Sequence, residues 1–289
     1  MTAAAALRQV MAFRCTRAPA EVIDSSLRRP ELRVRRTTYR GIVVDERLLT
    51  RGFPNVAARG RAQVLVSLRG SAVLHVPERV VIAPGEAWLI PRTAIATARF
   101  EDAELFEVEW AGDASARRLS LDAAALRAAA EELEGVGRDG SSQRAYFGEV
   151  IELVQALGVE LPRALGTLEG GPTERDLRLA DAIAEQLANL KREATAPHLG
   201  DDAALSARQL QRVFEDFNAR YGFNAKNWRD TRSRWRVQIA AVLLSVRALS
   251  IAEIADEVGF SSATALARAF ARWKLDTPNA LRAKLLADP

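Results

Sequence analysis

The sequence predicts an α+β protein with a β-rich amino-terminal part and a helical carboxy-terminal part. Between about Leu32 and Trp110, short β-branched or alternating runs recur, separated by turn residues, as in antiparallel sheets. After Gly112 the composition changes to alanine, leucine and charged residues at helical spacing. The length of 289 residues suits two domains rather than one.

The β-rich part is predicted to form a small sandwich or barrel within residues 1–112. Its turns are expected at 69–71, 76–78 and 83–86, where glycine or proline supplies the turn geometry. Six or more short strands in about 80 residues are typical of such a fold. The expected strands are 41–44, 62–68, 72–76, 80–82, 87–90 and 105–110.

Two helices are expected in residues 113–172, over 119–134 and 143–157. The second carries an apolar stripe that either packs in the core or forms a dimer contact: Tyr146, Phe147, Val150, Ile151 and Val154. Gly166–Pro172 is the expected linker, because paired glycines and a proline have low helix propensity. The helical region 113–172 therefore separates the first domain from a third segment, 173–289.

Composition excludes several classes of site. A single cysteine, Cys15, rules out an intrachain disulfide framework, and two histidines leave little for a metal centre. The amino terminus does not resemble a signal peptide, and no apolar run approaches about 18 residues. A cytoplasmic protein without membrane anchor, metal, cofactor or catalytic residues is expected.

A helix-turn-helix pattern is present in residues 250–270. Ser250 and Glu253 form a capping box that begins a first helix, and Gly259 is placed to end it in a left-handed turn. Ser261 or Ser262 can cap a second helix with Leu266, Phe270 and Trp273 inward and Ala263, Thr264, Ala267 and Arg268 outward. An ordinary pair of packed helices is the alternative, but a face of small residues and one arginine can enter a DNA groove.

A weaker copy of the pattern spans residues 199–217. Ser206 and Gln209 form another capping box, and Leu210, Val213, Phe214 and Phe217 form its buried stripe. Arginine and glutamine make bidentate contacts with guanine and adenine, so the outward side chains are candidate base readers: Arg208, Gln211 and Arg212. Taken alone, these polar residues could equally be a solvated face.

A long helix is expected between the two copies, over 227–246, and positive charge is concentrated beside it. Residues 206–236 carry eight bases and three acids, a net +5, whereas the whole chain carries +4. Such bases either line a solvated face or neutralise phosphates. The candidate phosphate contacts are Arg229, Arg232, Arg234, Arg236, Arg272 and Lys274.

Residues 199–282 resemble the DNA-binding domain of AraC/XylS-type transcription regulators. The resemblance is carried by Ile254-Ala255, Val258-Gly259-Phe260, Ser261-Ser262, Arg268-Ala269-Phe270, Thr277-Pro278 and Arg282. It implies two helix-turn-helix units in adjacent major grooves, usually activating at a promoter with RNA polymerase as a partner. By position, it places base readers at Arg208, Gln211, Arg212, Ala263, Thr264 and Arg268. The chain departs from the family pattern at Leu275 and Leu281, and it lacks a turn glycine at 203–205.

The first domain resembles, more loosely, the cupin-like sensor of these regulators, through residues 83–91. A small organic effector, a dimer surface, or both are therefore expected there. Candidate pocket residues are Arg69, Trp88, Arg92 and Trp110, although such side chains often serve as core and rim. His75 alone cannot supply the ligand set of a cupin enzyme, so it is expected to be a packed strand residue.

The sequence thus predicts a DNA-binding transcription regulator, an activator by resemblance, that recognises double-stranded DNA as a homodimer. A small organic effector or oligomerisation through the first domain is expected to control it. An architectural protein that binds most duplexes is one alternative, and a metal-dependent cupin-type enzyme is another.

Overall fold

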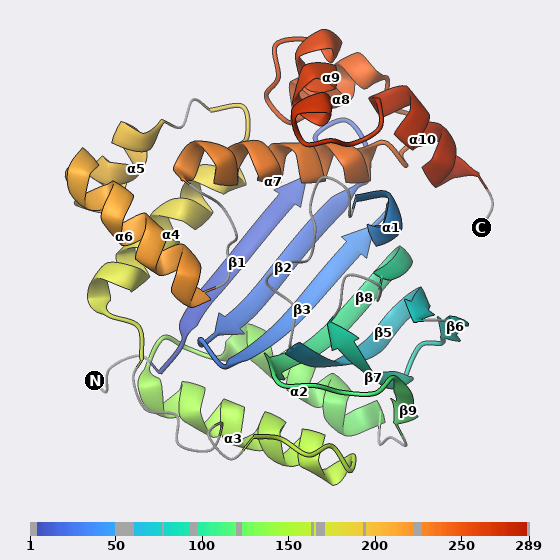
Figure 1. Ribbon diagram of the computed structural model, residues 1–289, viewed down its shortest axis with the longest axis vertical. Helices are drawn as coiled ribbons and strands as arrows, with labels where there is room; N and C mark the ends of the chain where they lie inside the picture. The colour runs from blue at the N-terminus through green and yellow to red at the C-terminus, as the bar shows by residue number, and fades with distance from the viewer. Residues whose placement is uncertain are drawn as a thin grey trace.

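The computed structural model describes residues 5–49, 61–76, 78–92, 97–119, 123–162, 165, 171–192, 195–221 and 227–287. In these residues an antiparallel sheet from the first part of the chain is followed by helices, so the predicted α+β class is confirmed (Figure 1).

The described strands form one nine-stranded antiparallel sheet. Its main path runs β1-β2-β3-β8-β5-β7-β9, while β4 pairs with β8 and β6 with β5. The strands are β1 (Leu7–Arg14), β2 (Glu21–Arg28), β3 (Leu32–Arg40), β4 (Val43–Asp45), β5 (Arg61–Val76), β6 (Glu78–Ile82), β7 (Ala87–Arg92), β8 (Thr97–Ala111) and β9 (Arg117–Leu119).

Two features of the sheet differ from the sequence prediction. Strands β1 and β2 precede Leu32, where no strand was expected, because polar residues such as Gln9 and Asp24 occupy buried positions and hide the apolar alternation. The turn expected at 69–71 is instead an irregularity within the single strand β5, with Gly70 at φ +73°. The turn at 83–86 is present, with Gly85 at φ +85°. Pro77 of the other expected turn lies outside the described residues.

Helices α2 (Ala123–Gly135) and α3 (Gly140–Ala156) cover one face of the sheet. The first begins later than expected, because residues 117–119 pair with β7 as β9. Asp139 caps α3 through the backbone N–H of Ser142. Most of the stripe on α3 is buried against the sheet, so core packing accounts for Tyr146, Phe147, Val150 and Val154.

The remaining helices lie against the opposite face and the ends of the first strands (Figure 1). A short helix, α1 (Glu46–Leu49), follows β4. The others are α4 (Glu174–Ala188), α5 (Ala196–Asp202), α6 (Ala207–Tyr221), α7 (Trp228–Leu243), α8 (Ile251–Glu257), α9 (Ala263–Arg272) and α10 (Pro278–Leu286). Residues 166–170 of the expected linker lie outside the described residues.

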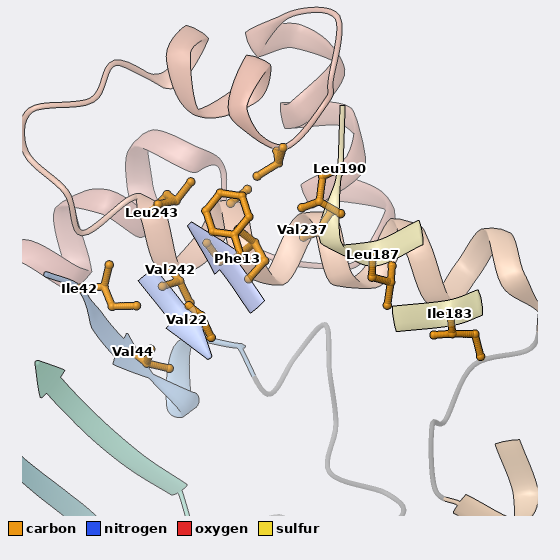
Figure 2. Packing of buried hydrophobic residues seen from close by; sticks show 14 of the residues in the cluster. Phe13, Val22, Ile42, Val44, Ile183, Leu187, Leu190, Val237, Val242 and Leu243 are labelled. Atoms are coloured by element: carbon orange, nitrogen blue, oxygen red, sulfur yellow. The ribbon is translucent and has the colours of Figure 1, made fainter. Parts of the chain in front are cut away.

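The sheet and the carboxy-terminal helices share one hydrophobic core. Phe13 and Val22 of the first two strands pack with Val242 of α7, and Leu187 of α4 belongs to the same cluster (Figure 2). Because this core crosses between the two parts of the chain, the helices are held against the sheet.

No helix in the described ranges is long and apolar enough to cross a membrane. The same part of the chain contains no group of three or more His, Cys, Asp or Glu residues placed to hold a metal ion.

Candidate nucleic-acid interface

Helices α8 and α9 form the second helix-turn-helix unit. Ser250 and Glu253 make the expected capping box, with Glu253 accepting from the Ser250 N–H at 2.8 Å. Gly259 has φ +76°, and the turn closes where the Phe260 N–H donates to the Ala255 carbonyl at 2.8 Å. A Cβ at Gly259 would lie 2.2 Å from the Leu190 carbonyl oxygen, so glycine is required sterically as well as conformationally.

Helices α5 and α6 form the first unit on the same plan. The Leu205 N–H donates to the Gly200 carbonyl at 2.7 Å, as Phe260 does to Ala255 in the second unit. The left-handed position is occupied by Ala204, at φ +54°, which explains how the unit turns without glycine at 203–205. Ser206 and Gln209 make the expected capping box, with the Ser206 N–H donating to Gln209 Oε1 at 3.0 Å.

The expected base-reading residues lie on exposed faces of α6 and α9. In the first unit all three side chains are exposed: Arg208, Gln211 and Arg212. In the second, Thr264 and Arg268 are exposed and Ala263 is half-buried. The apolar residues expected beneath these faces are buried, except Trp273, which is half-buried and donates through Nε1 to Ser233 Oγ at 3.1 Å.

The linking helix is shorter than the expected range 227–246. Helix α7 begins after Asn227, which caps the N–H of Asp230, and ends at Leu243. Its 16 residues correspond to about 24 Å. Arg282 donates to the carbonyls of Leu244 and Leu249, so it joins α10 to the segment after α7.

Two arginines of α7 point into the protein. Arg232 donates to the carbonyls of Leu190 and Arg192. Arg236 donates through Nε to the Val258 carbonyl at 2.5 Å and lies 4.0 Å from the Phe260 ring centroid. Burial, with a smaller effect from Arg232, lowers the pKa of Arg236 to about 10. Arg236 thus connects α7 to the end of α8, and Arg232 connects α7 to the segment that follows α4.

Three of the four other expected phosphate contacts are exposed. Arg229 and Lys274 are exposed, and Arg272 is exposed but donates to Asp230 Oδ1 at 2.7 Å. Arg234 is half-buried, and burial lowers its pKa.

The expected pocket residues are not brought together. Leu65 pairs with Trp88 and Ala62 with Trp110, and residues three apart in a strand face opposite sides, so the two tryptophans lie on opposite faces. Arg69 is exposed, and the side chain of Arg92 lies outside the described residues. His75 is half-buried on β5, and its buried Nε2 has no hydrogen-bond partner in the described structure.

A contact that sequence reasoning missed joins the loop between β1 and β2 to the second unit. Glu257 of α8 accepts from the Thr16 N–H at 3.1 Å, and Asp256 accepts from Arg17 Nη2 at 2.8 Å. Lys191 Nζ also donates to Asp256, at 3.1 Å. Burial opposes the charge of Glu257, but the bonds from Thr16 and the attraction of Lys191 outweigh it and lower its pKa. These residues are more than 60 positions apart, so no local pattern announces the contact.

Comparison with known proteins places a helix-turn-helix domain at the same residues. Residues 199–284 match the family model described as "Helix-turn-helix domain". Over 217 residues, the chain is 29% identical to a protein of Corynebacterium diphtheriae described as "HTH-type transcriptional regulator RipA". The match covers 73% of this chain and 57% of that relative, so the chain spans less than two thirds of the relative's length.

Similar solved structures are distant. ToxT from Vibrio cholerae O395 matches at 11% identity and a TM-score of 0.36, over 79% of this chain and 91% of ToxT. The AraC-like transcriptional activator CuxR matches at 14% identity and a TM-score of 0.27, over 68% of this chain and 74% of CuxR.

Proposed function

We propose that this chain, a member of the AraC/XylS-type regulators, binds promoter DNA sequence-specifically and regulates transcription. The observation that carries the proposal is the pair of helix-turn-helix units, each with a capped second helix whose outward face is accessible. A helix presented in this way can enter the major groove and read base edges.

The first unit supplies most of the base readout in this proposal. Arg208, Gln211 and Arg212 offer bidentate donors and acceptors to guanine and adenine. In the second unit Arg268 reads a base, while Ala263 and Thr264 allow close approach to the groove, with Thr264 also able to contact thymine methyl groups.

Accessible bases hold the duplex in register. Arg229 and Lys274 are placed to neutralise phosphates, and Arg272 and Arg234 add positive charge nearby. Arg232 and Arg236 act indirectly, because Arg236 holds the end of α8 and Arg232 holds the segment after α4.

The whole protein acts in the cytoplasm, without catalysis, and activates transcription beside RNA polymerase as a homodimer. An organic effector bound by the first domain, or oligomerisation through it, controls the activity. The shared core supports such control, because residues of the sheet, α4 and α7 belong to one hydrophobic cluster.

Binding to genomic DNA fragments from the source organism tests the proposal. Full-length protein should select a limited set of fragments, and its affinity should fall steeply as salt rises from about 50 to 200 mM. An absence of salt-sensitive binding to any fragment would contradict it. Affinities within a few-fold for all fragments would favour the architectural alternative.

A further inference from the structure

A group of polar side chains lies on the sheet face opposite α2 and α3. Alternating positions of neighbouring strands point to this face, which also carries the apolar residues Leu7, Phe13 and Val22. We call the group the polar island. It consists of Gln9, Asp24, Arg28, Arg33, Arg35, Thr37, Gln63, Glu107 and Glu109.

The island's ion pairs are unevenly distributed. Arg35 donates to Asp24 at 2.8 Å and to Glu107 at 3.2 Å, and Arg61 beside the island pairs with Glu109 at 2.6 Å. Arg33 comes no closer than 3.9 Å to Asp24, and Glu109 lies opposite it on β8. Its buried Nε has no hydrogen-bond partner in the described structure. Arg33 is therefore held by a longer ion pair to Asp24 than Arg35 is.

A second arginine lies directly across from Arg33. Arg28 is its cross-strand partner in the register of β2 and β3, and it is buried. Burial, followed by the repulsion of Arg33, lowers the pKa of Arg28 to about 9. Burial also lowers the pKa of Arg33, with Arg35 adding to the effect. An anion between the two arginines would relieve this repulsion.

Several polar atoms of the island also lack hydrogen-bond partners. Gln9 is only 3% exposed, yet neither atom of its side-chain amide has a hydrogen-bond partner among the described residues. The same is true of Asp24 Oδ1, Thr37 Oγ1 and Gln63 Oε1. Buried polar atoms are normally paired, so this set of acceptors, with the Gln9 amide nitrogen as a donor, indicates a ligand that carries both donors and acceptors.

We propose that the polar island binds a small hydroxylated carboxylate, with Arg33 and Arg28 holding the carboxylate and Gln9, Asp24 and Thr37 receiving its hydroxyl groups. Arg33 keeps 21% of its side chain exposed, although its Nε is buried. The proposal specifies the effector class within the proposed function, and it replaces the expected pocket by a different set of residues.

The site also touches the first helix-turn-helix unit. Arg28 Nη1 donates to the carbonyl of Tyr221 at 3.4 Å, and Tyr221 is the last residue of α6. In Figure 1 this end of α6 points toward the sheet. A carboxylate on Arg28 would therefore bind beside the end of the helix that carries Arg208, Gln211 and Arg212.

The test uses gluconate as the hydroxylated probe, with hexanoate as a six-carbon carboxylate without hydroxyls and chloride at equal ionic strength as the control. We expect gluconate to raise the melting temperature of full-length protein above the chloride control, and to bind more tightly than hexanoate by calorimetry. Stabilisation by hexanoate alone would overturn the role of the hydroxyl groups. An effect of neither probe would overturn the site.

Three variants locate the binding. Arg33→Gln should weaken gluconate binding about tenfold or more, since it removes a charge-assisted hydrogen bond. Arg40→Gln is the matched control on the other face of the same strand, where Arg40 pairs with Glu21, and it should bind normally. Equal gluconate affinity in the Arg33→Gln variant would contradict the assignment.

Gln9→Leu separates ligand binding from a structural role. It should weaken gluconate binding while leaving the free protein at least as stable, because an unpaired buried amide is removed. A lower melting temperature with unchanged affinity would instead show a structural role. DNA binding without ligand should persist in all three variants, so loss of the proposed regulator function is recognised separately from loss of the anion site.

Discussion

The two helix-turn-helix units follow one backbone plan but differ in what holds them and what they present. Each has a serine-capped second helix, a left-handed residue in the turn and one closing hydrogen bond, at 2.7 Å in the first unit and 2.8 Å in the second. The first exposes three long polar side chains on α6, whereas the second exposes smaller residues and Arg268 on α9. The comparison suggests that the first unit reads the DNA bases and that the second unit anchors the protein on the duplex.

The supports of the two units agree with this division. The second unit is connected through Asp256 and Glu257 to Thr16, Arg17 and Lys191. In the first unit the corresponding contacts lie at the carboxy-terminal end of α6. There Arg220 donates to Asp176 of α4 at 2.9 Å, and Arg28 donates to the Tyr221 carbonyl. The base-reading end of α6 is thus left accessible.

The largest expected effect contrasts the two turns. Gly259→Ala should destabilise the protein by more than about 3 kcal/mol, because its Cβ would clash with the Leu190 carbonyl at a left-handed φ. Ala204→Gly should be neutral or stabilising by about 1 kcal/mol or less, because relief of the left-handed strain exceeds the entropy cost of glycine. Urea unfolding of both variants measures the difference. Similar losses in the two variants would contradict the contrast.

The next effect concerns base recognition. Arg212→Ala and Arg268→Ala should each cost about 1–3 kcal/mol of discrimination between a selected duplex and a scrambled one. The double variant Arg212→Ala with Gln211→Ala should lose more of this discrimination, because it removes a second polar side chain from the exposed face of α6. Competition binding at constant salt provides the measurement, and a loss that is equal on both duplexes would argue against base contacts.

A smaller effect is expected from pH. The pKa of Glu257 in the folded protein is below its ordinary value of 4.5, so its stabilising contribution is present above that pH. The contribution should be lost as pH falls through the lowered folded pKa. Melting temperatures measured from pH 7 to 3 should decline less in Glu257→Gln than in wild type. Parallel declines would show that this carboxylate is not linked to folding.

The smallest expected effect distinguishes an arginine that contacts phosphate, Arg229, from one that stabilises the fold, Arg232. Arg229→Ala should weaken binding to all duplexes slightly and reduce the salt slope by about 1. Arg232→Ala should instead lower stability, because its guanidinium donates to the carbonyls of Leu190 and Arg192. Salt-dependent binding and thermal unfolding distinguish the two. A reduced salt slope for Arg232→Ala would restore the sequence expectation for that residue.

What could be predicted from the sequence follows the same contrast. The second unit is easy to recognise in the sequence for two reasons. Its turn sterically requires glycine at position 259, and its capping box is formed by Ser250 and Glu253, only three residues apart. The first unit is harder to recognise in the sequence, because an alanine, Ala204, occupies the left-handed position of its turn where a glycine would mark it. Strands β1 and β2 were missed because Gln9, Asp24 and Arg28 are polar at buried positions.

Long-range contacts were beyond local patterns altogether. Arg232 and Arg236 lie on a basic helix and looked like phosphate contacts, yet their partners are carbonyls 22 to 42 residues away. The two tryptophans of the expected pocket lie on opposite faces of the sheet, because successive residues of a strand point to alternate faces whatever their type. The contact of Thr16 with Glu257 joins positions 241 residues apart.

Selection of bound sequences from a library of randomised duplexes tests the central claim most directly, with wild-type protein compared with the Arg212→Ala variant. The account predicts two contacted segments about one helical turn apart, with the stronger base preference in the segment that loses it in the variant. Equal preference in both segments, or a preference unchanged by Arg212→Ala, would contradict a reading first unit and an anchoring second unit.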